Sequence, residues 1–385
     1  MIDRPQGGDQ ESSSKPSSDK AVLIALDFGE PDTEESLEEL RRLTESAGVS
    51  VQAVVQGKRS RPDAALFAGS GKVDEVGQAL RDTGSGVAIF NHDLSPAQQR
   101  NLEQRLQSRV VDRTSLILDI FAQRAQSHEG KVQVELAQLE RLSTRLVRGW
   151  THLERQKGGV GLRGPGETQL ETDRRLVGNR VKSLKEKLVK LTRQRHTQRR
   201  ARTKNAVFSV SLVGYTNAGK STLFNRLTHA GAYVADQLFA TLDTTSRRVF
   251  LPEVGQLVLS DTVGFIKHLP HGLVVSFRAT LEEAVQADLL LHVVDAASAA
   301  RDSQIEQVNS VLAEIGAAHL PQILVMNKID AASLSPRVER DEYGKISRIW
   351  ISAASGDGLD LVRQALIEAA KQTQEQTIQP EALTA

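Results

Sequence analysis

The sequence contains no cysteine, so neither disulfide bonds nor thiolate metal sites can form. This suits a reducing compartment, and we expect a cytoplasmic protein. No apolar run approaches the ~20 residues that a membrane-spanning helix needs. The stretch at residues 287–294 is interrupted by Asp288 and His292. Residues 1–20 are polar and serine-rich, without the apolar core of a signal peptide, and are expected to form a disordered tail.

The chain also has almost no net charge, +1, but that charge is unevenly distributed. Residues 174–204 hold thirteen lysines and arginines against one acidic residue, Glu186, so the stretch carries +12 (thirteen minus one). A helix that is merely solvated uses acidic partners one turn away, and this run lacks them. We therefore favour a polyanionic partner, with nucleic-acid phosphate first. An acidic protein and an anionic lipid surface remain alternatives.

One stretch carries the main chemical signal. Residues 214–221 match the P-loop spacing G-x-x-x-x-G-K-[ST], after an apolar run at residues 206–213 and before a helix predicted at residues 220–228. In that order backbone N–H groups curl around phosphate oxygens, and the helix N-terminus adds positive charge. A chance glycine-rich turn is the alternative. The predicted nucleotide-binding residues here are Gly214, Tyr215, Thr216, Asn217, Ala218, Gly219, Lys220, Ser221 and Thr222.

Three further motifs follow, each just past a predicted strand, which places the ligand outside the carboxyl ends of a sheet. The first follows residues 256–260 and supplies Asp261 for a Mg²⁺ shell and the Gly264 N–H for the γ-phosphate. The second, ending the strand at residues 323–326, supplies Asp330 to accept from the guanine N1–H and 2-amino group, which argues for GTP over ATP. The third follows the strand at residues 348–351, and its backbone is expected to meet the guanine O6. The predicted residues are Asp261, Thr262, Val263, Gly264, Asn327, Lys328, Ile329, Asp330, Ser352, Ala353 and Ala354.

Between the P-loop and Asp261 we expect a switch segment in which one hydroxyl completes the Mg²⁺ shell when the γ-phosphate is present. Thr241 is the first choice, with Thr244 and Thr245 as substitutes. The metal set is then Ser221, Thr241 and Asp261. The catalytic set is Lys220, Thr241 and Gly264. The segment's predicted nucleotide-binding residues are Phe239, Ala240, Thr241, Leu242 and Asp243.

The residue after Gly264 is Phe265, where many GTPases keep a glutamine that orients the attacking water. A phenyl ring cannot hydrogen-bond a water. We therefore expect slow intrinsic hydrolysis, with the missing group supplied by a partner, another loop or a bound cation. Asn217 is a candidate ligand for a monovalent cation near the phosphates; alternatively, it braces the loop.

Upstream, residues 21–112 alternate between short apolar strands and amphipathic helices, which predicts a small α/β domain with a parallel sheet. The strands are expected at residues 22–26, 51–55, 86–90 and 110–111, and the helices at 34–44, 73–80 and 96–106, the last capped by Ser95. Within this domain, residues 69–72 read Gly-Ser-Gly-Lys. A plain turn before a helix is favoured over a phosphate loop, because the P-loop spacing is incomplete.

Residues 113–204 change to long helices with leucine and valine at heptad-like spacing, which predicts an antiparallel helical hairpin. Its glycine-rich tip, residues 158–169, is either a flexible connector or a loop whose bare backbone approaches a partner while Arg163 contacts phosphates. Arg174 and Arg175 open the basic run and are expected to bind RNA. The predicted fold is therefore a Ras-like α/β P-loop G domain (residues 205–372) preceded by the parallel α/β domain and the hairpin, with a polar tail at 373–385.

These features together resemble the HflX family, translational GTPase-like proteins of the TRAFAC class. The resemblance covers about residues 21–371 and rests first on the glycine loop and its continuation, residues 158–171. Residues 173–175, 112–114, 117–121, 69–73 and 261–266 support it. Some relatives continue into a further small domain, whereas here the G domain is expected to end near Lys371.

The resemblance implies GTP hydrolysis coupled to binding of the large ribosomal subunit and its rRNA, with stalled ribosomes split or rescued, notably after heat stress. Activation by the ribosome would answer the problem that Phe265 raises. It also implies that some members use ATP through the N-terminal region, for which residues 69–72 are the place to look. We expect a monomer. The alternatives are an RNA-binding assembly or antiassociation factor in which GTP is mainly structural, and a membrane-surface GTPase.

Overall fold

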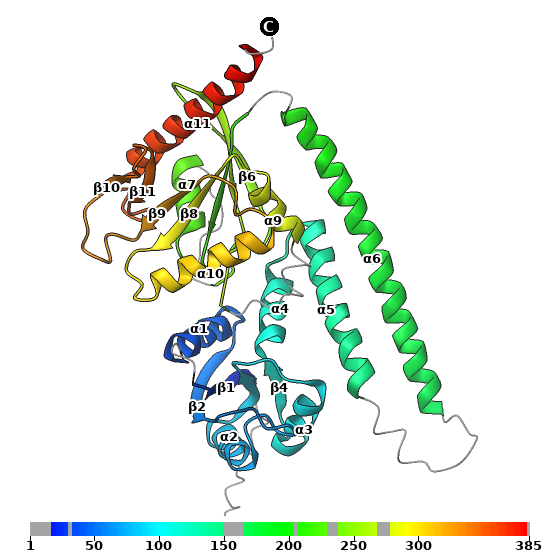
Figure 1. Cartoon of the computed structure of the whole chain (residues 1–385). Helices are drawn as coiled ribbons and strands as arrows, with labels where there is room; N and C mark the ends of the chain where they lie inside the picture. Colours follow the sequence, from blue (N-terminus) through cyan, green and yellow to red (C-terminus); the bar gives the residue numbers. More distant parts are fainter. Residues whose placement is uncertain are drawn as a thin grey trace, which may run out of the picture. The chain divides into compact units, whose positions relative to one another are not determined.

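Two compact units make up the chain, Met1–Leu116 and Ile117–Ala385. Figure 1 shows the computed structural model, which describes residues 17–29, 33–149, 165–203, 207–228, 238–267 and 278–382. Both units contain parallel sheets covered by helices, so the predicted α/β class is confirmed. Among the described residues, no helix combines the length and the apolar character needed to cross a membrane.

The first unit is a four-stranded parallel sheet in the order β2-β1-β3-β4. Its central strands are almost wholly apolar, because helices cover both faces of such a sheet. Val22, Ile24 and Phe90 are completely buried in its core. The elements are β1 (Ser17–Asp27), α1 (Thr33–Ser46), β2 (Ser50–Lys58), α2 (Ser70–Thr83), β3 (Ser85–Phe90), α3 (Pro96–Leu106) and β4 (Arg109–Asp112).

Helix starts in this unit follow from local chemistry. Ser95 caps α3 as expected: the Gln98 N–H donates to Ser95 Oγ (3.2 Å) and the Ser95 N–H donates to Gln98 Oε1 (3.0 Å). At the Gly-Ser-Gly-Lys stretch, α2 begins directly after Gly69, whose φ of 78° favours glycine. Lys72 Nζ donates to the Gln56 carbonyl (2.8 Å) and pairs with Glu75 (2.6 Å). A turn before a helix accounts for this stretch.

The hairpin consists of α5 (His128–Gly149) and α6 (Pro165–Thr203), preceded by α4 (Arg113–Arg124); Figure 1 shows α5 and α6 side by side and antiparallel. Its predicted seam is confirmed: Val132, Leu136 and Leu184 are buried together. The predicted loop ended too late, since α6 begins at Pro165. Proline suits a first helical position because its φ is already helical and its missing N–H would have no partner there.

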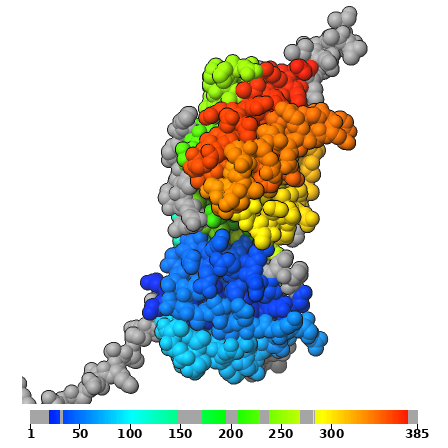
Figure 2. Space-filling view, turned by 90° about the vertical axis from the view of Figure 1, so that its left-hand side faces the viewer, coloured from blue at the N-terminus to red at the C-terminus, as the bar shows by residue number. Residues whose placement is uncertain are grey.

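The seven-stranded sheet of the second unit has the order β10-β11-β9-β8-β5-β7-β6, parallel except for the antiparallel edge strands β6 and β10. Figure 2 views the side that carries β10 and α11, coloured orange to red. The strands are β5 (Ser209–Gly214), β6 (Thr245–Leu251), β7 (Gly255–Asp261), β8 (Leu289–Asp295), β9 (Gln322–Asn327), β10 (Arg337–Arg340) and β11 (Ile346–Trp350).

Helices α7 (Lys220–Thr228), α9 (Arg278–Val285), α10 (Arg301–Glu314) and α11 (Leu359–Ala382) complete this unit. Leu212, Leu291 and Val325, from the three central strands, are completely buried in one core with Phe224 of α7 and Val362 of α11. Because β5, β7, β8, β9 and β11 all run parallel, the loops that follow them gather at one edge of the sheet. The predicted nucleotide motifs occupy those loops.

Candidate nucleotide site

The P-loop joins the end of β5 to the start of α7 and depends on two glycines. Gly214 and Gly219 have φ values of 145° and 96°. A β-carbon on Gly214 would overlap the Val293 carbonyl, and one on Gly219 would overlap the Asn327 side-chain amide. No other residue fits these two positions without displacing its neighbours. The turn therefore keeps its backbone bare, as a phosphate-binding loop requires.

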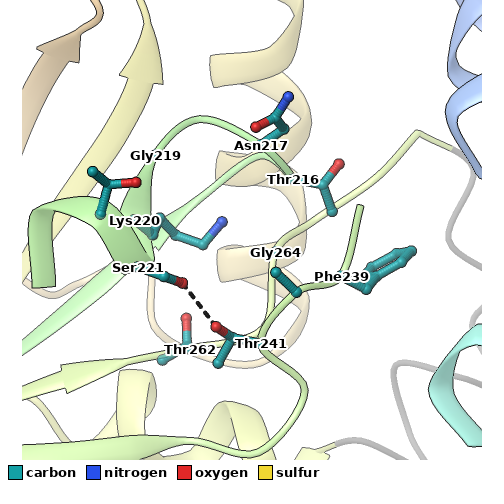
Figure 3. Close-up of a pocket in the computed structure, with 11 residues that line it drawn as sticks. Thr216, Asn217, Gly219, Lys220, Ser221, Phe239, Thr241, Thr262 and Gly264 are labelled. Carbon is teal, nitrogen blue, oxygen red and sulfur yellow. Dashed lines mark hydrogen bonds between the residues drawn. The ribbon is translucent and has the colours of Figure 1, made fainter. Parts of the chain in front are cut away.

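Lys220 is buried at the first position of α7 and points into the loop (Figure 3). Its Nζ donates to the carbonyls of Gly214 (3.0 Å) and Tyr215 (2.8 Å). An ammonium group has three N–H donors, so one is left for a phosphate oxygen. Burial lowers the pKa of Lys220 to about 8, against the opposing effect of Asp261. A phosphate would supply the negative charge that this buried cation needs.

Three predicted metal ligands come together beside Lys220. Ser221 Oγ lies 2.7 Å from Thr241 Oγ1, the pair joined by the dashed line in Figure 3. Both hydroxyl oxygens also lie within hydrogen-bond distance of Asp261 Oδ2, Ser221 at 2.6 Å and Thr241 at 3.0 Å. The other carboxylate oxygen, Asp261 Oδ1, is buried and has no hydrogen-bond partner among the described residues. Burial raises the pKa of Asp261, opposed by the bond from Ser221. These oxygens fit Mg²⁺, which favours hard oxygen ligands.

One pocket holds most of the predicted phosphate site. Its lining is Thr216, Asn217, Gly219, Lys220, Ser221, Thr222, Phe239, Ala240, Thr241, Thr262 and Gly264 (Figure 3). Gly264 packs closely: a β-carbon there would lie 2.8 Å from Thr216 Cα and 2.9 Å from Lys220 Nζ. Thr216 Oγ1 is buried and makes no hydrogen bond to the described part of the chain. Its hydroxyl is thus an unsatisfied donor and acceptor at the phosphate pocket.

Phe265, the residue in place of a catalytic glutamine, is 2 % exposed and is not part of the pocket lining. Its backbone pairs with the P-loop: the Phe265 N–H donates to the Gly214 carbonyl (3.1 Å) and the Thr216 N–H donates to the Phe265 carbonyl (2.7 Å). The Lys267 N–H donates to the Tyr215 hydroxyl (2.7 Å). The P-loop and the segment after Gly264 are therefore held together, with the phenyl ring turned into the core.

The motifs predicted to bind guanine meet at Asn327, at the end of β9. Its Oδ1 accepts from the Ala353 N–H (2.9 Å) and its Nδ2 donates to the Ala218 carbonyl (2.8 Å). One side chain thus joins the P-loop to the loop after β11. Asp330 is exposed and has no hydrogen bond or ion pair with the described residues. Its carboxylate is available for a base.

Two residues of the switch segment lie away from their expected place. Leu242 is 2 % exposed, buried as an apolar side chain would be. The Asp243 carboxylate accepts hydrogen bonds from residues at the start of α5 rather than facing the pocket, because backbone N–H groups at a helix start need acceptors. Phe239, Ala240 and Thr241 do line the pocket.

The predicted RNA-binding arginines are partly described. Arg174 and Arg175 are exposed on α6, whereas Arg163 lies outside the described residues. Two members of the basic run do have acidic partners across the hairpin: Arg180 pairs with Glu135 (2.6 Å) and Lys185 with Glu140 (2.8 Å). The exposed residues Arg175, Lys182, Lys187 and Lys190 make no ion pair with the described part of the chain.

Three family models match the chain in succession. They are described as GTP-binding GTPase N-terminal (residues 34–122), GTP-binding GTPase Middle Region (residues 124–202) and 50S ribosome-binding GTPase (residues 209–328). Together they follow the order of the α/β domain, the hairpin and the P-loop domain.

Proteins called GTPase HflX are similar over most of their length. The one from Escherichia coli K12 is 56 % identical over 96 % of this chain and 84 % of its own. The one from Magnetococcus marinus is 50 % identical over 84 % and 75 % of the two chains. Among solved structures, one described as SsGBP in complex with GDP has a TM-score of 0.52 and 24 % identity, covering 92 % of this chain and 99 % of its own. That likeness extends the shared fold to nearly the whole chain.

Proposed function

The chain belongs to the HflX family of GTPases and is a GTP hydrolase, and we propose that it is a Mg²⁺-dependent switch activated by the large ribosomal subunit. The observation that carries the proposal is that Lys220, Ser221 and Thr241 line one pocket, with the Asp261 carboxylate hydrogen-bonded to the two hydroxyls. In the proposed cycle of GTP binding and hydrolysis, the protein binds the large subunit through its basic hairpin and splits or rescues stalled ribosomes.

Within the site, Lys220 uses its remaining N–H to bind the β- and γ-phosphates and to stabilise charge that develops on them. Ser221, Thr241 and Asp261 would hold Mg²⁺, which would neutralise charge on the phosphate oxygens. The Gly264 N–H faces the γ-phosphate. The Thr216 hydroxyl, buried and without a hydrogen bond to the residues that the structure describes, lies at the same end of the pocket.

Base selection follows from Asp330. A carboxylate accepts two parallel hydrogen bonds from the N1–H and the 2-amino group of guanine, and adenine offers no such pair. Asn327 supports this end by holding the loop after β11, including the Ala353 N–H, against the P-loop. We propose GTP and GDP as the ligands, in keeping with the GDP complex of SsGBP.

Water activation is the step for which the chain offers no glutamine. Because the Phe265 ring is buried, the group that orients water comes from the ribosome or from a monovalent cation held near Asn217. Asn217 lines the pocket with a φ of 60°. A turnover assay in which sodium replaces potassium separates these two sources, because turnover should depend on the cation only if the cation supplies the group.

The partner is proposed from the hairpin. The exposed basic side chains of α6 suit an RNA backbone. Lysine and arginine neutralise its phosphate charges whatever the base sequence. The description 50S ribosome-binding GTPase supports the large subunit as the source of that RNA. In this proposal one chain binds the large subunit through its hairpin and hydrolyses GTP in its G domain, as two steps of the same cycle.

The test is GTP turnover with and without purified large subunits, together with sucrose-gradient analysis of 70S ribosomes. Strong stimulation and an increase in free subunits with GTP are expected. Bound nucleotide without stimulation would instead favour an assembly or antiassociation factor in which GTP is structural. If binding persists on anionic vesicles after nuclease treatment but ribosomes do not bind, the basic arm contacts lipid.

A further inference from the structure

The segment that carries Thr241 is anchored at the start of the hairpin. The Asp243 carboxylate accepts three hydrogen bonds there: from the backbone N–H groups of Gln126 (2.8 Å) and Ser127 (2.7 Å) to Oδ2, and from the Ser127 hydroxyl (2.5 Å) to Oδ1. All three donors lie immediately before α5. Asp243, two residues after the proposed metal ligand Thr241, is thus hydrogen-bonded to the residues that lead into the first helix of the hairpin.

This carboxylate completes the cap of α5. Ser127 is the residue before the helix, and its Oγ accepts from the Gly130 N–H (2.8 Å), as a capping serine does. The preceding N–H groups, on Gln126 and Ser127, are supplied with an acceptor by Asp243. A negative charge at a helix N-terminus is also stabilised by the helix dipole. The start of the hairpin and the switch segment therefore stabilise each other.

Gly130, in the first turn of α5, makes room for this contact. A β-carbon on Gly130 would overlap Asp243 Oδ1 and would lie 3.1 Å from Ser127 Oγ. Glycine is a poorer helix former than alanine. Glycine nevertheless stands in the turn of α5 that the Asp243 carboxylate approaches, where a larger residue would collide with it.

A second contact lies on the other side of Thr241. The Phe239 ring packs edge-on against Phe121 of α4, with ring centres 4.7 Å apart and an interplanar angle of 86°. Both rings are 2 % exposed, and Phe239 also lines the phosphate pocket. Residues 239 and 243 are thus both held by the segment that leads into the hairpin, while Thr241 between them bonds to Ser221 and Asp261.

We infer that Asp243 is a positioning residue that ties Thr241 to the first turn of α5, so that the hairpin and the γ-phosphate site are coupled. Two residues span at most about 7 Å, so Thr241 cannot move far while Asp243 stays bound. Engagement of Thr241 by a triphosphate steadies the start of α5. Displacement of α5 by a bound partner, in turn, moves Thr241, since coupling between two sites is reciprocal. The inference rests on the proposed function in one respect, the assignment of Thr241 to the metal in the triphosphate state.

The first test needs no ribosome. Hydrogen exchange of the Gln126 and Ser127 amides is measured with Mg²⁺ and either GDP or the non-hydrolysable analogue guanosine 5′-(β,γ-imido)triphosphate. Exchange is expected to be at least about fivefold slower with the triphosphate, the lower end of typical coupling. Equal exchange in the two states of the wild-type chain would overturn the inference.

Variants on both sides of the contact sharpen the test. Asp243→Ala removes the acceptor, and Gly130→Ala fills the space that the carboxylate occupies while improving the helix propensity of α5. Both are expected to abolish the nucleotide dependence of exchange. Asp243→Asn keeps one oxygen acceptor and is expected to restore part of it. If Gly130→Ala keeps the wild-type difference in exchange between the GDP and triphosphate states, the contact with Asp243 is not what carries the nucleotide dependence, and the inference fails.

Asp341→Ala is the matched control. Asp341 also accepts two backbone N–H groups, from Tyr343 and Lys345 (both 2.9 Å), but it lies in the turn between β10 and β11. Melting temperatures and GDP affinity of each variant establish that it is folded. Asp341→Ala is expected to keep the full nucleotide-dependent difference in exchange. If Asp341→Ala loses that difference, the effect of Asp243→Ala is not specific to its contact with α5.

Stimulation of GTP turnover by large subunits is then measured for the same proteins. Asp243→Ala and Gly130→Ala are expected to lose at least about fivefold of the wild-type ratio of stimulated to unstimulated rate. If the wild type itself is not stimulated but shows the exchange difference, the proposed ribosomal trigger fails and the coupling stands. If the wild type is stimulated and both variants retain its ratio, the coupling fails and the trigger stands.

Discussion

The Asn327 side-chain amide nitrogen would overlap a β-carbon placed on Gly219, so the last P-loop glycine leaves room for the motif predicted to bind guanine. Nδ2 uses that space to donate to the Ala218 carbonyl (2.8 Å). The phosphate and base ends of the site are thereby joined by a single side chain at the end of β9. Gly219 is required both by its φ of 96° and by this neighbour.

Gly219→Ala is therefore expected to weaken binding of both GDP and GTP at least about tenfold, because Asn327 and the loop after β11 must shift. Fluorescent-nucleotide titration measures the loss. Gly71→Ala is the control, since a β-carbon on Gly71 meets nothing within 4 Å and the residue is helical. That variant should bind nucleotide like the wild type and be stabilised by up to about 1 kcal/mol. Wild-type affinity in Gly219→Ala would contradict this interpretation.

Lys220→Ala should abolish GTP hydrolysis, because no other described cation lines the phosphate pocket. Loss of a buried charge-stabilising group of this kind typically costs about 10²–10³ in rate. Single-turnover hydrolysis at saturating GTP separates this effect from weakened binding. A rate equal to that of the wild type would place the chemistry elsewhere in the chain.

The stability of the G domain should fall as the pH is lowered, because of His292. This residue of β8 is 1 % exposed, and Gln322 Nε2 donates to its Nδ1 (2.5 Å), which requires that nitrogen to be unprotonated. Burial, with a smaller effect of Lys220, lowers the pKa of His292 to about 4 from its ordinary 6.5. Between these values the unfolded chain binds a proton and the folded chain does not, so the free energy of unfolding decreases as pH falls, by about 3 kcal/mol in all.

Urea unfolding at several pH values between 7.5 and 5 measures this decrease. In His292→Gln, which keeps a neutral polar side chain, the slope should be smaller by up to one proton. Identical slopes in the two proteins would show that other groups cause the acid sensitivity.

Reversal of charge at the start of the basic run should weaken association with large ribosomal subunits. Arg174→Glu/Arg175→Glu changes two exposed side chains of α6, and its binding should also depend less steeply on salt, by about one counterion per lost phosphate contact. Pelleting with subunits at several salt concentrations measures both effects. Arg41→Glu/Arg42→Glu, an equal charge change on α1, is the control. Unchanged pelleting of the α6 variant would exclude this part of the hairpin as the RNA-binding surface.

Much of the fold could be predicted because its strands are buried on both faces and read as apolar runs, as β5 and β9 do. The edge strands β6 and β10 could not, since charged, exposed residues interrupt them: Arg247 and Arg248 in β6, and Arg337 and Arg340 in β10. Helix α6 begins inside a glycine-rich stretch that resembles a loop, and Pro165 is the only local sign of its start.

The site divides in the same way. Lys220, Ser221 and Asp261 belong to short motifs whose spacing alone predicts their chemistry. The place of Asp243 could not be predicted, because its partner Ser127 lies 116 residues earlier in the chain and neither belongs to a recognised motif.

The burial of Phe265 has a consequence for engineering. Its backbone makes the bonds to the P-loop, and its ring fills the core, so the position serves packing rather than chemistry. Phe265→Gln would bury an amide without partners and cost stability instead of delivering a water-orienting group. This substitution alone is therefore not expected to raise intrinsic GTP hydrolysis.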